Sequence, residues 1–450
     1  MTIAIGRRND TQRDALVIAI TLAIGFAAAL ATAGPYGYLM PVAVLGMAGS
    51  GYVVLAAMQG RRWALCGILC FALVVPNIGF VQRDIHDTST LDPQNALKIV
   101  LWAAMAAIAL ARWRSYSHLL RDGVLFWLAI FAGIAIASTA WSPVRIYTGI
   151  GAVGLAAALG FCCTIAAEVP RATLLRTVTF ALVAYLVINT VAMLALPTVT
   201  WAEDEIGTRF QGVSTHPNIL AKEFASFICL FTPLALAEKR IRLAIFLVLA
   251  SLAIMVPTGS RTAILGVLLA FVLPLAMHRR ARGPMAIAIA LFGILVLALA
   301  VGWRPDLQML VGEASRDAAG SDVMTLTGRT ELWSFVWDKI QYAPIFGYGF
   351  ISANDVLSTD WWGPTDASVG AHNSWLQTLL TLGIVGFVPF LMMHVELWRR
   401  WFQGSRYLRL VVPFLTILGL TEIEMAAQPV LVTLVAFLLA ALDTVERKNE

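Results

Sequence analysis

Three basic residues stand at or just inside the starts of long apolar stretches, on the side that the charge pattern places outside the membrane. Arg209 precedes one stretch, Lys222 lies one turn inside it, and Arg261 opens another. A single such cation often reaches lipid phosphates or pairs with an acidic neighbour, in this sequence Glu223. Three at one depth favour a phosphate or pyrophosphate ligand, because a planar guanidinium donates two parallel charge-assisted hydrogen bonds.

His372 stands at the start of a further apolar stretch and is the main candidate for a general base. Histidine titrates near neutral pH, so it can accept a proton from a hydroxyl group. Its structural alternative is a helix cap or a surface residue. His216 is a rival base at another such start, where Pro217 and Asn218 also allow a purely structural interpretation.

Other catalytic chemistries lack a matching motif. The sequence has no D-x-D pair, no Walker-type phosphate loop, no G-x-S-x-G and no H-E-x-x-H. The acidic residues 203–205 and the pair Glu422 and Glu424 have no histidine partners. Weak binding of a cation is one interpretation of each group, and we favour the other, a solvated acidic loop. The five cysteines lie inside apolar stretches as small core residues. We therefore expect no metal and no cofactor.

The composition requires that membrane-spanning helices position these residues. Of the 450 residues, 59% are hydrophobic and 13% are charged, whereas soluble domains have about 25% charged residues. The hydrophobic residues fall in long blocks with almost no charge. Such blocks cross a bilayer as helices, because every backbone polar group must be satisfied within the segment. Fourteen blocks are predicted, at 15–33, 36–58, 63–80, 96–111, 123–140, 146–167, 173–196, 218–237, 241–256, 262–277, 284–303, 373–396, 407–421 and 428–442.

The charged connectors between the blocks predict the orientation. Most basic residues fall in every second connector, together with both termini, and most acidic residues fall in the others. Because positive charge stays inside, both ends are predicted to be cytoplasmic. The first block also has features of a cleaved signal peptide, and the immediate next span favours an uncut helix. Basic clusters of this kind are topology signals, so no nucleic-acid partner is expected.

One connector, 304–371, is too long to be a simple link and is predicted to lie outside as part of one transmembrane domain spanning residues 1–450. Within it, a helix is predicted from Gly328 to Tyr342, with one apolar face. This helix either lies on the outer leaflet or packs against the bundle. After the loop, Gly383 and Gly386 indicate close helix packing.

Four stretches together resemble the O-antigen ligase and Wzy-type polymerase superfamily, especially its exopolysaccharide-polymerase branch. They are RFQG with HPN at 209–218, GSRT at 259–262, TGRTELW at 327–333 with the glycines at 347 and 349, and AHN at 371–373 with the glycines at 383 and 386. The likeness covers about residues 205–395. It implies an all-α polytopic fold of about 12–14 transmembrane helices with a large periplasmic loop.

The resemblance also implies a function. It is that of an inverting, metal-independent glycosyltransferase of the bacterial inner membrane, whose donor is a glycan on undecaprenyl pyrophosphate. Arg209, Arg261 and Arg329 would bind the pyrophosphate, and His372 would deprotonate the acceptor hydroxyl. Supporting roles would fall to His216, Asn218 and Asn373, which lie within these stretches. Lys222 is a further candidate for support that matches none of the four stretches, so its role stays open. Membrane lipids, chain-length regulators and flippases would be further partners.

Three functions remain open on these observations. A polymerase would transfer a growing glycan to another lipid-linked repeat unit, and an O-antigen ligase would transfer it to the lipopolysaccharide core. A transporter or flippase for the same lipid-linked glycans belongs to a different class. Transporters often show internal repeats and broken helices at the bilayer midplane. The sequence shows no clear repeat, and its unusual charges lie at the outer surface, so we expect a transferase and not a transporter. The sequence does not show the acceptor that separates a polymerase from a ligase; we expect the polymerase, because the resemblance is to the exopolysaccharide-polymerase branch.

Overall fold

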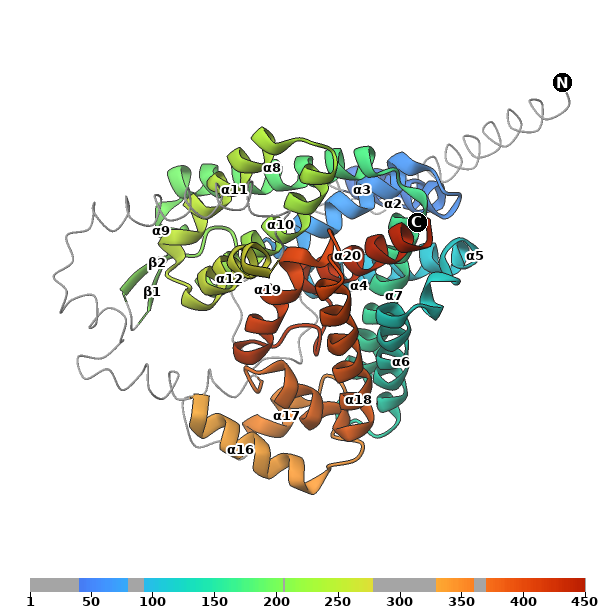
Figure 1. Ribbon diagram of the computed structural model, residues 1–450, viewed down its shortest axis with the longest axis vertical. Helices are drawn as coiled ribbons and strands as arrows, with labels where there is room; N and C mark the ends of the chain where they lie inside the picture. The colour runs from blue at the N-terminus through green and yellow to red at the C-terminus, as the bar shows by residue number, and fades with distance from the viewer. Residues whose placement is uncertain (1–39, 80–92, 205–206, 278–328, 360–369, 450) are drawn as a thin grey trace, which may run out of the picture. The chain divides into compact units, whose positions relative to one another are not determined.

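The structure, a computed structural model, describes residues 40–79, 93–204, 207–277, 329–359 and 370–449. Within these ranges the chain is helical apart from one two-stranded hairpin (Figure 1). This architecture confirms the predicted all-α polytopic membrane fold. The predicted spans 15–33 and 284–303, and the loop residues 304–328 and 360–369, lie outside the described residues.

The chain divides into two compact units, one up to Ile68 and a second from Leu69 onward. The first unit contains α2 (Met40–Met58) and the first part of α3 (Arg62–Val74), with the rings of Tyr52 and Trp63 6.0 Å apart. The sequence predicts two spans in this region. In the structure α2 and α3 qualify only as a bent pair, which corresponds to one broken span or a re-entrant loop.

The second unit holds the remaining elements. Its first part consists of η2 (Val75–Asn77), α4 (Pro93–Ala111), α5 (Trp113–Tyr116), η3 (Leu119–Arg121), α6 (Gly123–Ala137), η4 (Ser138–Ala140), α7 (Arg145–Glu168), α8 (Arg171–Ala195) and α9 (Pro197–Thr200). Its second part consists of β1 (Trp201–Asp204), β2 (Gly207–Phe210), α10 (Pro217–Ala237), α11 (Ile241–Met255), η5 (Val256–Thr258), α12 (Arg261–Met277), α16 (Arg329–Tyr342), α17 (Ala353–Ser358), α18 (Ser374–Phe402), α19 (Leu408–Thr421) and α20 (Leu431–Asn449).

Seven described helices are long and apolar enough to cross a membrane, and α12 and α19 are shorter apolar helices. The seven segments are Gln94–Ala111, Gly123–Ala140, Arg145–Glu168, Arg171–Ala195, Pro217–Ala237, Ile241–Thr258 and Ser374–Phe402. Each agrees closely with a predicted block, because continuous apolar sequence sets both. The segments in α7 and α10 have the largest shares of buried residues among the seven, 78% and 83%. These two helices therefore form the centre of the second unit.

The helix α18 is broken near its first third, which the sequence does not predict. Gly383 has φ 60° and ψ −162°, so the regular backbone hydrogen bonding stops there. The segment 344–349 supplies the missing partners, because Ile384 N–H donates to the Pro344 carbonyl at 2.9 Å and Gly349 N–H donates to the Thr381 carbonyl at 2.7 Å. Gly383 therefore marks close packing between a loop and a broken helix. The sequence-based interpretation of Gly383 and Gly386 was close packing between two helices.

The predicted loop helix is present as α16, and its apolar face is covered by protein. Leu332, Val336 and Ile340 are buried in a small core with residues of α17 and α18, whereas Asp338 is exposed. The structure shows the helix packed against α17 and α18, and its placement on the outer leaflet stays a prediction. Two rings of this helix are exposed, those of Trp337 at 52% and Tyr342 at 83%.

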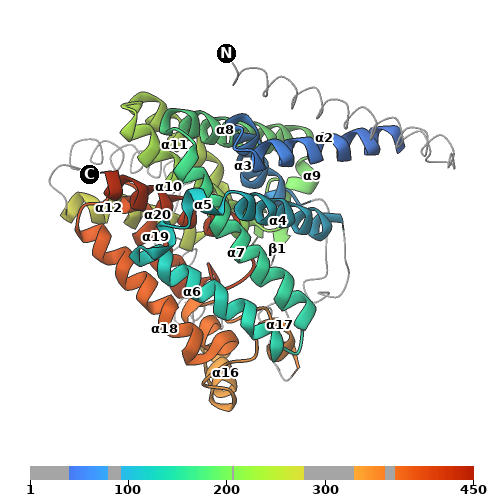
Figure 2. The same ribbon diagram turned by 90° about the vertical axis from the view of Figure 1, so that its right-hand side faces the viewer.

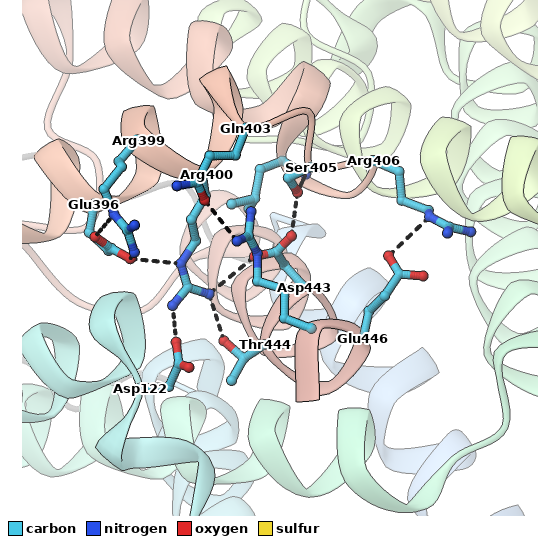
Figure 3. A network of polar contacts seen from close by, with 12 residues as sticks. Asp122, Glu396, Arg399, Arg400, Gln403, Ser405, Arg406, Asp443, Thr444 and Glu446 are labelled. Carbon is cyan, nitrogen blue, oxygen red and sulfur yellow. Dashed lines mark hydrogen bonds and ion pairs between the residues drawn. The ribbon is translucent and has the colours of Figure 1, made fainter. Parts of the chain in front are cut away.

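The other end of α18 is fixed by a buried ionic network (Figure 3). Arg400, only 2% exposed, contacts Glu396 at 3.0 Å and Asp443 at 3.1 Å, and also pairs with Asp122. Thr444 accepts a further hydrogen bond at 3.0 Å. The network joins α18 to α20 and to the residue preceding α6, which runs beside α18 (Figure 2).

Candidate active site

Arg209 is held on the short hairpin that precedes α10. Strand β2 pairs with β1 in antiparallel register, with Arg209 opposite Ala202. The Arg209 guanidinium donates from Nε to the Thr258 carbonyl at 2.8 Å and from Nη2 to Asn218 Oδ1 at 2.6 Å. The residue is only 6% exposed. These bonds fix the plane of a buried cation between the end of η5 and the start of α10.

The turn that follows η5 lies directly against this side chain. Gly259 has φ +63°, and a Cβ atom added there would lie 3.3 Å from Arg209 Nε. A residue without a side chain is therefore needed both for the turn and for the approach of the arginine. Ser260 is buried, and Arg261 begins α12 as an exposed residue. The structure thus brings the predicted stretches 209–212 and 259–262 together.

The start of α10 explains the sequence HPN. His216 is the N-cap residue, and its Nδ1 accepts the backbone N–H of Asn218 at 3.1 Å, while Pro217 occupies the first turn. This is the structural interpretation of His216, because the ring satisfies a backbone donor that has no partner within the helix. Asn218, in turn, holds Arg209 through its side chain.

Lys222 makes two ion pairs inside the protein. Its ammonium lies 3.1 Å from a carboxylate oxygen of Glu422 and 3.1 Å from one of Glu424. The lysine side chain is 16% exposed and that of Glu424 is 4% exposed. The interpretation of Glu422 and Glu424 as a solvated acidic loop is therefore wrong, since the pair compensates a cation at a helix start. The neighbouring Glu223 instead accepts a hydrogen bond from Tyr185.

The two carboxylates outnumber the single ammonium between them. Burial raises the pKa of Glu424, the attraction of Lys222 opposes that shift, and the nearby charge of Glu422 adds to it. The second carboxylate oxygen of Glu424 is buried and has no hydrogen-bond partner among the described residues. A buried carboxylate in this setting is costly, and the ion pair with Lys222 offsets part of that cost.

The His372 turn packs against the segment that carries Glu422 and Glu424, called the acidic segment below. His372 has φ +44°, a left-handed conformation that is uncommon for a residue with a side chain. Asn373 caps α18, accepting the backbone N–H groups of Trp375 and Leu376 at 2.9 and 3.1 Å.

Two side chains of this turn bind the end of α19 and the chain that follows it. Asn373 Nδ2 donates to the Leu420 carbonyl at 3.2 Å. Ser374 Oγ lies within hydrogen-bond distance of the Glu422 carbonyl at 2.9 Å and of the Glu424 N–H at 2.8 Å.

One face of α10 links the arginine to the histidine turn. Asn218 and Lys222 are four residues apart, so they project from the same face about 6 Å apart along the helix axis. Asn218 holds Arg209, and Lys222 holds the acidic segment on which Ser374 docks. The starts of α10, α12 and α18 therefore meet at one end of the bundle. Basic side chains from the first two stretches and the turn that carries His372 are thus linked through α10.

Arg329 is the predicted cation that the structure places least fully. It is the first residue of α16, and its side chain lies outside the described part of the chain. Its role in binding a pyrophosphate stays a prediction. Within the described ranges, no group of three or more His, Cys, Asp or Glu residues is arranged to hold a metal ion.

Sequence reasoning missed three contributors, namely Glu422, Glu424 and Ser374. Their contacts join residues about 200 and 50 positions apart, which no local pattern reports. One signal was available. Lys222 sits one turn inside an apolar span, where an ionisable residue needs a partner.

Comparison with known protein families gives a match over part of the chain that carries the candidate site. The family model described as O-antigen ligase matches residues 245–391, a range that contains Arg261, Arg329 and His372. This match supports the assignment of the chain to the O-antigen ligase and Wzy-type superfamily, whose members are glycosyltransferase-like enzymes of glycan assembly. A search of curated proteins gives no match.

Proposed function

We propose that this member of the O-antigen ligase and Wzy-type superfamily is a polymerase that extends a polysaccharide on a lipid pyrophosphate carrier. Its donor is a growing glycan linked to undecaprenyl pyrophosphate, and its acceptor is the terminal sugar hydroxyl of a lipid-linked repeat unit. The observation that supports the proposal is the contact path from Arg209 through Asn218, Lys222 and the acidic segment to the His372 turn.

The proposed step is a single displacement. The acceptor oxygen forms a bond to the anomeric carbon while the bond from that carbon to the pyrophosphate oxygen breaks. The hydroxyl proton passes to the His372 imidazole, and the bonding electron pair leaves with the pyrophosphate. One displacement at that carbon inverts its configuration. A positioned base of this kind contributes about 10²- to 10⁴-fold in rate.

The arginines provide the electrostatic part of the proposal. The leaving pyrophosphate gains negative charge as the bond breaks, and donors that are already in place stabilise that charge without reorganisation. Arg209 meets this condition, because Thr258 and Asn218 hold its guanidinium plane. Arg261, at the start of α12, and Arg329, at the start of α16, are the further proposed ligands. Because these cations supply the counter-charge, the proposed reaction is metal-independent.

The membrane placement follows from the same proposal. A lipid-linked donor keeps its tail in the bilayer, so the reacting head group meets the protein at the membrane surface. We place the enzyme in the bacterial inner membrane with its site at the periplasmic face and both termini in the cytoplasm. Flippases and chain-length regulators are then the expected partners, since the first deliver repeat units and the second limit chain growth.

The alternative enzyme is a ligase that uses the same donor and a different acceptor, the lipopolysaccharide core. The glycans in membranes of a deletion strain distinguish the two. A polymerase predicts the loss of long chains while single lipid-linked repeats persist. Full-length chains that remain on the carrier contradict the polymerase and favour the ligase.

A transporter of lipid-linked glycans remains the alternative of a different class. Its best structural support is the break in α18 at Gly383, because discontinuous helices are common in transporters. Purified protein supplied with donor and acceptor in detergent decides the matter. A longer glycan formed there, without any membrane to cross, supports the transferase, and the absence of any product favours transport.

A further inference from the structure

The residue before His372 is hydrogen-bonded both to the large loop and to α18. Trp333 of α16 donates from its indole Nε1 to the Ala371 carbonyl at 2.9 Å, and the Ala371 N–H donates to Gln377 Oε1 at 3.0 Å. Both hydrogen bonds fix the peptide groups that lead into the left-handed His372. A strained turn persists only where its surroundings hold it.

The same loop packs against the first third of α18, and the two segments share one core. Leu332, Val336 and Ile340 of α16 share one buried core with Leu357 of α17 and with Ala371 and Leu380 from the segment that carries the turn, and all six are at most 6% exposed. Next to this core, the backbone of the 344–349 segment fills the break at Gly383, where Tyr348 N–H donates to Leu380 at 3.1 Å and Val385 N–H donates to Ile345 at 3.1 Å.

This loop is itself anchored to the membrane helices at two points. Phe350 N–H donates to Ser138 Oγ at 3.1 Å, and Trp141 Nε1 donates to the Phe346 carbonyl at 3.2 Å. Gly347 has φ +62°, and a Cβ atom there would lie 2.5 Å from the Thr381 carbonyl carbon, so the loop and the broken helix touch backbone to backbone. The His372 turn is therefore held on its N-terminal side by α16 and its loop, and on its C-terminal side by the contacts of Asn373 and Ser374 with residues 420–424.

We propose that Trp333 is a positioning residue for His372, acting through the Ala371 carbonyl, and that the loop helix α16 serves the reaction as the support of the base. The inference rests on the proposed function, because it assumes that His372 accepts the acceptor proton. Small errors in the placement of a base are expensive, since a shift of about 1 Å can cost about 10²-fold in rate.

The test compares Trp333→Phe with Trp337→Phe in purified full-length protein with donor and acceptor. Phenylalanine keeps an aromatic ring and removes the indole donor. Trp337, one turn further along α16 and 52% exposed, provides the matched control. We expect Trp333→Phe to lower kcat about tenfold. The donor KM should change by less than about twofold and the midpoint of thermal unfolding by less than about 2 °C, so that the loss of kcat does not come from misfolding. Trp337→Phe should leave kcat unchanged.

The decisive arm repeats Trp333→Phe in a His372→Ala background. A residue that acts only through the base has no further effect once the base is gone. The same fold-loss in both backgrounds, or a loss of donor binding together with kcat, overturns the positioning role. If His372→Ala itself leaves transfer intact, the proposed base fails as well. A normal loss in His372→Ala with none in Trp333→Phe overturns this inference alone.

Discussion

The Arg209 side chain lies against the backbone of Gly259, so close that a Cβ atom at the glycine would be 3.3 Å from the guanidinium Nε. Two stretches that are separate in the sequence are thereby one structural feature. The left-handed turn at Gly259 also places the Thr258 carbonyl where it accepts from the same nitrogen.

Gly259→Ala is expected to weaken donor binding. An alanine at this φ costs about 1–2 kcal/mol, and its methyl group presses on the arginine that we propose as a pyrophosphate ligand. We expect donor affinity to fall about tenfold, measured by titration of a lipid pyrophosphate into purified protein. Gly133→Ala in α6, where the added methyl group meets nothing within 4 Å, is the control. Equal affinity in both variants would separate the turn from donor binding.

Arg261→Lys tests the second proposed ligand. Lysine keeps the positive charge but cannot make two parallel hydrogen bonds to one phosphate. We expect the dissociation constant of the lipid pyrophosphate to rise by about tenfold, on the scale of one charge-assisted hydrogen bond. Arg242→Lys in α11 is a control at a position outside the candidate site. An unchanged dissociation constant for Arg261→Lys would contradict the role of Arg261 as a pyrophosphate ligand and would favour an interaction with lipid head groups.

Lys222→Met should destabilise the protein, because it leaves the buried Glu424 and the half-buried Glu422 without their shared cation. Removing one partner of a buried pair typically costs about 3 kcal/mol. We expect a lower midpoint of thermal unfolding in detergent, part of which returns when Glu424→Gln is added. Glu203→Gln, at an exposed position on the hairpin, should restore nothing. If Lys222→Met unfolds at the wild-type temperature, the ion pairs do not contribute to the fold.

Arg400→Met probes the buried network at the other end of α18. The substitution removes a buried cation shared by Asp122, Glu396 and Asp443, and should cost about 3 kcal/mol. Glu396 keeps its pair with Arg399 and Asp443 keeps its pair with Arg447. The adjacent Arg399 also pairs with Glu396 but is 57% exposed, so Arg399→Met should cost less than about 1 kcal/mol. Thermal unfolding of the two variants gives the comparison. Similar midpoints would show that burial does not distinguish these two arginines.

The sequence predicts the spans well because continuous apolar stretches alone determine them. The block 218–237 differs from α10 by one residue at its start, and 146–167 differs from α7 by one at each end. The apolar face of α16 was also predictable from its helical spacing, since Leu332, Val336 and Ile340 are all buried.

The features that escape sequence analysis depend on long-range contacts. The break at Gly383 requires partners from the 344–349 segment, and a pair of glycines equally fits helix–helix packing. The burial of Glu422 and Glu424 depends on Lys222, about 200 residues away, whereas their immediate neighbours resemble a loop. The two-stranded hairpin at Arg209 is too short for an alternating pattern to reveal it. The site was therefore predictable in its residue types and order, but not in its supports.

Transfer by His372→Ala, measured in purified protein with both donor and acceptor supplied, tests the central claim most directly. The account predicts that donor binding is retained while the transfer rate falls by about 10²-fold or more. His216→Ala, at the exposed cap of α10, should transfer at close to the wild-type rate. A His372→Ala protein that turns over as fast as the wild type would contradict the account, because no base would then stand opposite the arginines.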